Sequence, residues 1–147
     1  WLLAFGTVVA KRVQTARFMF LFLLGAVAGA GLHYIFHNAD LVPMIGASAA
    51  VSACMGAAVR FAFPKGGRFG MADASQLPIQ SLREAFSNKQ VVTFTLIWFA
   101  INLLAGAGVL DPSGDGQSIA WEAHVGGFIA GLLCFGLIDN SGYQRDY

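Results

Sequence analysis

The stretch GASAAVSACMGAA, from Gly46 to Ala58, is built almost entirely of small residues. Within it Ser48, Ser52 and Gly56 recur at four-residue spacing, which places them in one row along a helix. Small residues in such rows let membrane helices approach one another closely. We therefore expect this stretch to form a helix at the centre of a bundle, packed against other helices rather than against lipid.

The composition is that of a membrane protein. Of the 147 residues, 56% are hydrophobic and only 12% are charged, and this charged share is about half that of a soluble domain. The net charge of +1 does not bear on nucleic-acid binding, but no basic stripe interleaved with aromatic residues is present, so nucleic acid is not expected as a partner. Cys54 and Cys134 lie in apolar runs without a CxxC pair, so neither a disulfide nor a metal framework is predicted.

Four apolar segments are long enough to cross a bilayer as helices, which takes about 20 residues each. They are Phe18–Phe36, Met44–Phe63, Val91–Leu110 and Ile119–Ile138. A fifth segment, Trp1–Ala10, is too short to span and is expected to be the end of a helix whose beginning is missing. No alternation of period two is present, and unpaired backbone groups are costly in lipid, so the segments are predicted to be helices. The sequence predicts an all-α polytopic transmembrane helix bundle in a single domain, residues 1–147, with four full transmembrane helices plus the end of a preceding one.

The charged residues indicate how these helices are oriented. If the helices alternate in direction, all 9 basic residues fall on one side of the membrane: Lys11, Arg12, Arg17, Arg60, Lys65, Arg68, Arg83, Lys89 and Arg145. The opposite connections carry acidic residues and no Lys or Arg: Asp40, Asp111, Asp115 and Glu122. Because basic loops stay in the cytoplasm, the sequence predicts an integral protein of a bacterial inner membrane with its basic loops cytoplasmic.

This orientation brings a serine and a histidine to the same depth. The segments Met44–Phe63 and Ile119–Ile138 both run inward, and Ser48 and His124 each lie roughly 6–8 Å below the start of their helix. A serine hydroxyl becomes a nucleophile when an adjacent base takes its proton, and histidine suits that role near neutral pH. The depth permits a hydrogen-bonded pair, although a membrane serine can instead bond to the carbonyl one turn earlier.

Other polar residues offer rival interpretations. Ser52, one turn deeper than Ser48 on the same face, is a rival nucleophile. His33 and His37 stand at i, i+4 spacing, which could hold a metal, but no further Cys, Asp or Glu completes a set at fixed spacing. We therefore predict no metal, and expect both histidines to be interfacial or to face a water-filled cavity. Asn102 is the main polar residue at mid-depth outside the Ser48–His124 pair, and no internal repeat indicates a transporter.

Several motifs together resemble one family. GASAAVSACMGAA resembles the GxSG-containing helix of the rhomboid intramembrane serine proteases, and AWEAHVGGFIAGLL resembles that family's AHxxGxxxG helix. The stretch FGTVVAKRVQTARFMFLFLL is similar to the family's second helix and the start of its third, and TLIWFAINLL to its fifth helix. The likeness extends over essentially the whole chain in the right order, without the first helix and most of the second.

The resemblance implies a function and a set of site residues. It implies a serine endopeptidase, without cofactor, whose partners are the lipid bilayer and membrane-anchored proteins that it cleaves in or near their transmembrane segment. Ser48 would be the nucleophile and His124 the general base, with backbone N–H groups of Gly46, Ala47 and Ser48 forming the oxyanion hole. Phe94 and Trp98 match positions that flank the family's lateral substrate gate, with ordinary lipid-facing packing as the alternative. A non-proteolytic relative that binds transmembrane clients is the alternative function.

The chain departs from the family pattern in three places. Ala49 replaces the glycine after the serine, and Ser52 stands where many members have a tyrosine that stacks on the histidine. The imidazole of His124 must therefore be oriented by another residue. The family's HxxxN motif, which supplies side-chain oxyanion donors, would precede Trp1.

Overall fold

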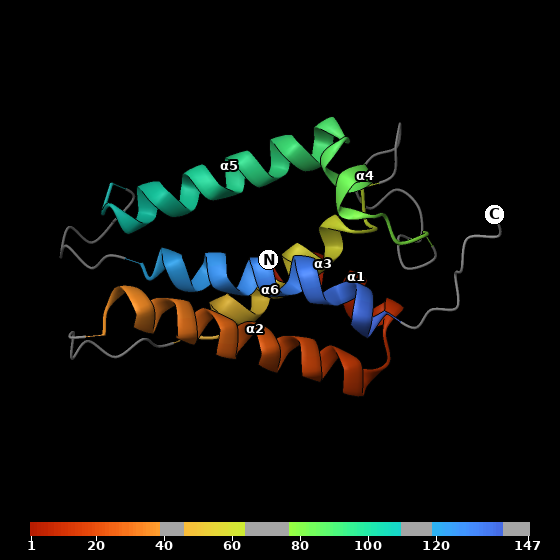
Figure 1. The fold of residues 1–147 in the computed structure, drawn as a ribbon, viewed down its shortest axis with the longest axis horizontal. Helices are drawn as coiled ribbons and strands as arrows, with labels where there is room; N and C mark the ends of the chain where they lie inside the picture. Colours follow the sequence, from red (N-terminus) through yellow and green to blue (C-terminus); the bar gives the residue numbers. More distant parts are fainter. Residues whose placement is uncertain (39–45, 64–76, 110–118, 140–147) are drawn as a thin grey trace.

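The computed structural model describes residues 1–38, 46–63, 77–109 and 119–139, and Figure 1 shows its helices running side by side along one axis. The elements are η1 (Leu2–Gly6, a π-helical turn), α1 (Thr7–Arg12), α2 (Thr15–Phe36), α3 (Ser48–Val59), α4 (Leu82–Phe86), α5 (Lys89–Gly106) and α6 (Trp121–Ile138). All the described elements are helices, which confirms the all-α prediction for this part of the chain.

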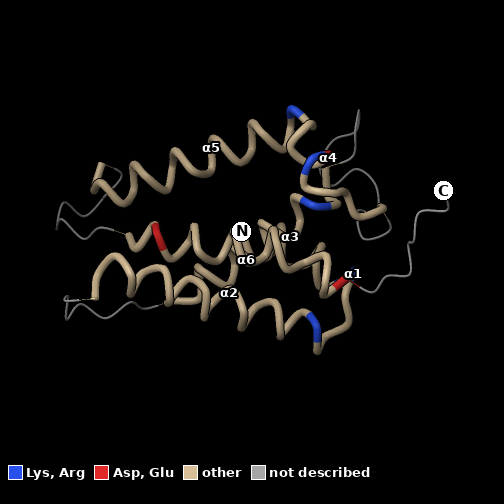
Figure 2. Tube along the Cα trace, in the orientation of Figure 1, with Lys and Arg blue, Asp and Glu red and all other residues tan. Residues whose placement is uncertain are grey.

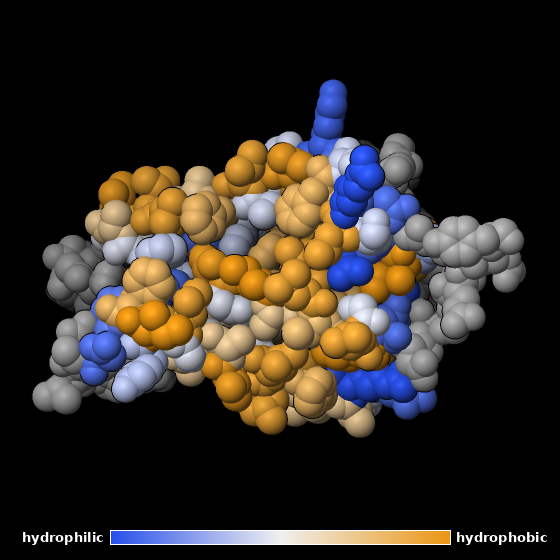
Figure 3. All heavy atoms as spheres, in the orientation of Figure 1, coloured by the Kyte–Doolittle hydropathy of each residue, from blue (hydrophilic) through white to orange (hydrophobic). Residues whose placement is uncertain are grey.

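Three of these helices, α2, α5 and α6, are long and apolar enough to cross a membrane. Apolar side chains cover the middle of the face seen in Figure 3, and hydrophilic ones gather toward its ends. The segment predicted as a span over Met44–Phe63 differs, because its helix α3 has 12 residues, about 18 Å at 1.5 Å per residue. The apolar core of a bilayer is about 30 Å thick, so α3 alone is shorter than a span. The part of this segment before Gly46 lies outside the described residues.

Helix α3 lies at the centre of the bundle, as its small residues predict. Ten of its 12 residues are buried, and α2 and α6 pack against it and against each other. On α6, Gly127 lies against the backbone of Ala49 and Gly131 against the backbone of Ala53. The absence of side chains at these two glycines is what lets α6 lie directly on α3.

Helix α5 packs more loosely than α3. Only Val91, Trp98, Asn102 and Ala105 of its 18 residues are buried. Its start is fixed by Asn88, whose side-chain oxygen accepts a hydrogen bond from the backbone N–H of Gln90. Figure 1 shows α5 running along one side of the bundle. This looser packing leaves room for a cavity between α5 and the central helices.

The Lys and Arg residues in the described part of the chain lie at one end of the bundle, and Lys65, Arg68 and Arg145 lie outside the described residues. Figure 2 shows Lys and Arg gathered at the end where α1 and α4 lie. Two interactions join the helices at this end. The Arg12 guanidinium pairs with Asp139 at 2.7 Å, and Arg60 donates to the carbonyl of Leu132 on α6 at 2.9 Å. These contacts tie the ends of α1, α3 and α6 together.

Candidate active site

A cavity of about 510 Å³ lies between α3, α5, α6 and the beginning of the chain. Its polar lining includes Ser48 and Ser52 of α3, Asn102 of α5 and His124 of α6. Most of the other lining side chains are apolar or aromatic. A mostly apolar cavity with a few convergent polar groups is the usual form of a binding or catalytic site.

Ser48 and His124, the two predicted catalytic residues, line this cavity together. Ser48 is the first residue of α3 and is exposed, and His124 lies in the first turns of α6 and is half-buried. No hydrogen bond joins the two side chains in the described part of the chain. Catalytic hydrogen bonds are often long without substrate and tighten when it binds. The direct pairing of Ser48 with His124 therefore stays a prediction.

Asn102 holds the imidazole of His124. Its Oδ1 lies 2.6 Å from His124 Nδ1, and its Nδ2 donates to the carbonyl of Trp98 at 2.7 Å. The bond to Trp98 fixes the amide so that its oxygen faces the histidine, and an oxygen can only accept. Nδ1 must therefore carry the proton, which leaves Nε2 free as a base. Sequence reasoning noted Asn102 as a polar residue at mid-depth but did not connect it with His124.

Ser52, the rival nucleophile, has its hydroxyl engaged within its own helix. Ser52 Oγ donates to the carbonyl oxygen of Ser48 at 2.9 Å, and the residue is only 4% exposed. This is the back-bond to the carbonyl one turn earlier that serine commonly makes in a helix. Of the two serines lining the cavity, Ser48 is thus the exposed one.

The entry to α3 presents backbone donors beside Ser48. Gly46 has a φ of 121°, a conformation that residues with a Cβ rarely adopt. Ala47 is the N-cap of α3, and no side chain caps this helix. The first N–H groups of a helix have no partner within it, and the helix dipole favours negative charge there. The turn at Gly46 thus starts α3 with its free donors next to the Ser48 hydroxyl.

The structure brings His33 and His37 together with Glu122, a residue that sequence reasoning left out. His33 Nδ1 lies 2.6 Å and His37 Nδ1 3.2 Å from Glu122 Oε1. The sequence analysis considered only ligands at fixed spacing along the chain, and Glu122 does not lie at such a spacing from either histidine. Glu122 reaches the histidines from another helix, where α6 begins beside the end of α2.

A family model described as the rhomboid domain matches residues 1–139. The chain belongs to the rhomboid family. Most rhomboid proteins are intramembrane serine proteases, and the family also includes inactive members. No curated protein and no solved structure matches the chain. Together with the three apolar helices, the family makes this rhomboid protein an integral membrane protein.

Phe94 and Trp98, the predicted gate residues of this rhomboid protein, both line the cavity. Trp98 is 8% exposed and stacks on Phe128 of α6 with ring centroids 4.6 Å apart. Phe94 contacts the rings of Phe5 and Phe63, each at 5.3 Å. The alternative for this pair was that both side chains face the lipid. The Trp98 side chain is buried against α6 and therefore does not face the lipid.

Ala49, which replaces a glycine of the rhomboid pattern, is accommodated by a glycine opposite. Its methyl group packs against Gly29 of α2, where an added Cβ would overlap it. Ala49 itself is 3% exposed. The methyl group therefore fills a space that α2 leaves open, and it points away from the cavity lining.

Proposed function

We propose that this rhomboid protein is an intramembrane serine endopeptidase that cleaves membrane-anchored proteins within or beside their transmembrane segment. The observation that carries this proposal is that Ser48 and His124 line the same cavity. Asn102 accepts a hydrogen bond from Nδ1 of the His124 imidazole, which leaves Nε2 to act as the base. The family supports the proposal, because most of its members are proteases of this kind.

The proposed chemistry follows from these groups. As Ser48 Oγ bonds to the carbonyl carbon of the substrate, its proton passes to His124 Nε2. The carbonyl oxygen becomes an oxyanion, for which the free N–H groups around Gly46, Ala47 and Ser48 are the proposed donors. His124 then gives the proton to the leaving amine as the C–N bond breaks, and water releases the acyl group from Ser48 by the same steps in reverse order.

The membrane placement of the protein is part of this proposal. We place the end with α1 and α4, where Lys and Arg gather, on the cytoplasmic side of a bacterial inner membrane. The domain, residues 1–147, would then cross the membrane with four segments, α3 supplying the centre of the one over Met44–Phe63. Phe94 and Trp98 would border the route by which the substrate segment reaches the cavity from the lipid.

The test is reconstitution of the full-length protein in liposomes with a single-span membrane protein as substrate. The expected result is two fragments cut within or beside the transmembrane segment. The alternative function is that of a rhomboid protein that binds transmembrane clients without cleaving them, because the family includes inactive members. If a panel of single-span proteins co-purified with it intact and none was cleaved, that result would support the client-binding function and overturn the protease proposal.

Replacing Asn102 with alanine is expected to lower kcat by roughly 10- to 100-fold, because positioned general-base catalysis contributes about 10²–10⁴ and a freely rotating imidazole loses part of it. KM should change much less than kcat, since Asn102 acts through His124. The measurement is the rate of substrate cleavage across pH. Thr93→Ala, an exposed change on the same helix, is the control. An Asn102→Ala protein with an unchanged kcat and pH profile would contradict this role.

A further inference from the structure

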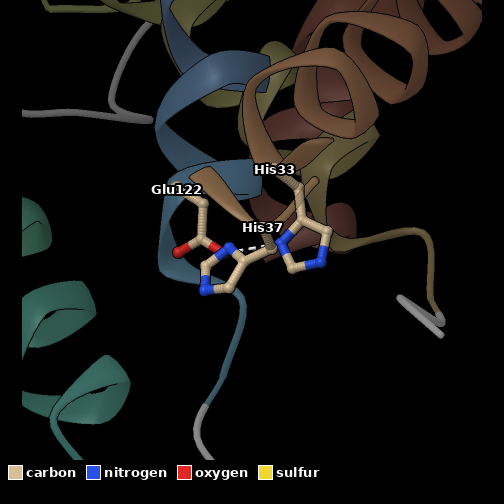
Figure 4. Close-up of side chains that lie close together, drawn as sticks. All are labelled: His33, His37 and Glu122. Atoms are coloured by element: carbon tan, nitrogen blue, oxygen red, sulfur yellow. Dashed lines mark hydrogen bonds and ion pairs between the residues drawn. The ribbon is translucent and has the colours of Figure 1, made fainter. Parts of the chain in front are cut away.

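Three side chains that can bind metal converge where α2 ends and α6 begins (Figure 4). His33 lies in the last turn of α2, His37 is the next residue after that helix, and Glu122 is the second residue of α6. The candidate ligand atoms of all three lie within 4.8 Å of one another. The two imidazole rings stack with centroids 4.7 Å apart, and the Nδ1 atom of each ring faces the same carboxylate.

The hydrogen bonding of this cluster is incomplete. Glu122 has a side chain only 3% exposed, and its Oε1 lies 2.6 Å from His33 Nδ1. His37 Nδ1 lies 3.2 Å from the same oxygen, yet it is buried and makes no hydrogen bond to any described residue. A buried polar atom without a partner in a native structure needs an explanation, and an ion is one of the few available.

The distances suit a tetrahedral metal ion. Zinc binds His nitrogen and carboxylate oxygen at about 2.0–2.2 Å, which sets two of its ligands about 3.3 Å apart. His37 Nδ1 and Glu122 Oε1 are already 3.2 Å apart. The His33 Nδ1–Glu122 Oε1 distance of 2.6 Å would need to widen by about 0.7 Å. That movement is small for side chains at the end of a helix.

We propose that His33, His37 and Glu122 form a binding site for a divalent transition metal of the zinc class. Two imidazoles and one carboxylate are a ligand set that zinc accepts, whereas calcium and magnesium prefer oxygen ligands alone. The side chain of His37 is 39% exposed, which leaves a fourth position open to water. The metal would join the end of α2 to the start of α6.

This site is separate from the proposed active site. None of its three residues is among those lining the cavity. Glu122 and His124 are two residues apart, about 200° around α6, so their side chains leave the helix on opposite faces. Metal binding therefore does not depend on the proposed protease activity, and the two proposals fail independently.

The test is zinc binding by isothermal titration calorimetry to the full-length protein, purified with a tag free of histidine and stripped with a chelator. One zinc per rhomboid domain is expected, together with a rise in the thermal unfolding temperature, because the ion binds the folded arrangement of two helices. His33→Ala, His37→Ala and Glu122→Gln should each weaken binding by at least about tenfold. His37→Ala matters most, since His37 ends its helix with Nδ1 unbonded and its replacement should not disturb folding.

His124→Ala is the matched control, because His124 is the third and last histidine in the 147-residue sequence. This variant should bind zinc as the unaltered protein does. Loss of binding in His124→Ala, with binding retained in His37→Ala, would place the ion in the cavity and overturn the proposal. The proposal would also be overturned if the unaltered protein bound no zinc, or if the His37→Ala and Glu122→Gln proteins bound zinc as tightly as the unaltered protein. The cluster would then be a hydrogen-bonded contact only.

Discussion

Replacing Ser48 with alanine in the full-length protein should lower cleavage of a single-span substrate by about four to six orders of magnitude, to the background of the assay. The reason is that Ser48 is the exposed serine in the cavity that His124 also lines, so its loss removes the covalent step. His124→Ala should have the same effect. The double variant should be no slower than either single one, because residues of one catalytic unit do not contribute additively. The measurement is product formed over hours in liposomes.

Ser52→Ala is the matched control for this prediction. It removes a hydroxyl from the same helix face and the same cavity, but one that already donates to the Ser48 carbonyl. We expect its cleavage rate to stay within a few-fold of the unaltered protein. An inactive Ser52→Ala protein beside an active Ser48→Ala protein would make Ser52 the nucleophile. Full activity in both variants would rule out serine catalysis at this cavity.

The helices and their packing were predictable because they depend on local composition. Runs of apolar residues marked α2, α5 and α6, and small residues at four-residue spacing marked α3 as the central helix. The length of α3 was not predictable in the same way. The apolar run continues to Phe63, but the helix ends at Val59, and the guanidinium of Arg60 directly after it donates to the carbonyls of Gln80 and Leu132.

The candidate site was predictable only where one helix carries the signal. Ser48 stands in a row of small residues and His124 in the stretch that resembles the AHxxGxxxG helix, and both line one cavity, although α3 begins at Ser48 itself. Asn102 and Glu122 act across helices, and their partners lie 22 and 89 residues away along the chain. Such contacts depend on how helices rotate about their axes. A search for polar residues at equal depth on neighbouring helices would have found both pairs.

Replacing Gly127 with alanine is expected to destabilise the fold by about 2–3 kcal/mol, near the upper end for an overpacked core. An added Cβ at Gly127 would overlap the carbonyl oxygen of Ala49, and both groups belong to helix backbones that cannot rotate away. The two helices would have to separate where Ala49 follows Ser48, which would also widen the distance between Ser48 and His124. The measurements are the midpoint of thermal unfolding in detergent and the cleavage rate of the fraction that stays folded.

Gly136→Ala on the same helix separates this steric effect from helix propensity. Alanine favours a helix over glycine by up to about 1 kcal/mol, so both changes should stabilise α6 if propensity alone decided the outcome. At Gly136 the nearest atom to an added Cβ is Arg60 Nη2 at 3.5 Å, an ordinary contact with a flexible side chain, and the residue is exposed. Gly136→Ala should therefore unfold at the same temperature as the unaltered protein or slightly above it. Equal unfolding temperatures for the two variants would show that α3 and α6 do not pack backbone against backbone, and the depth match between Ser48 and His124 would lose its structural basis.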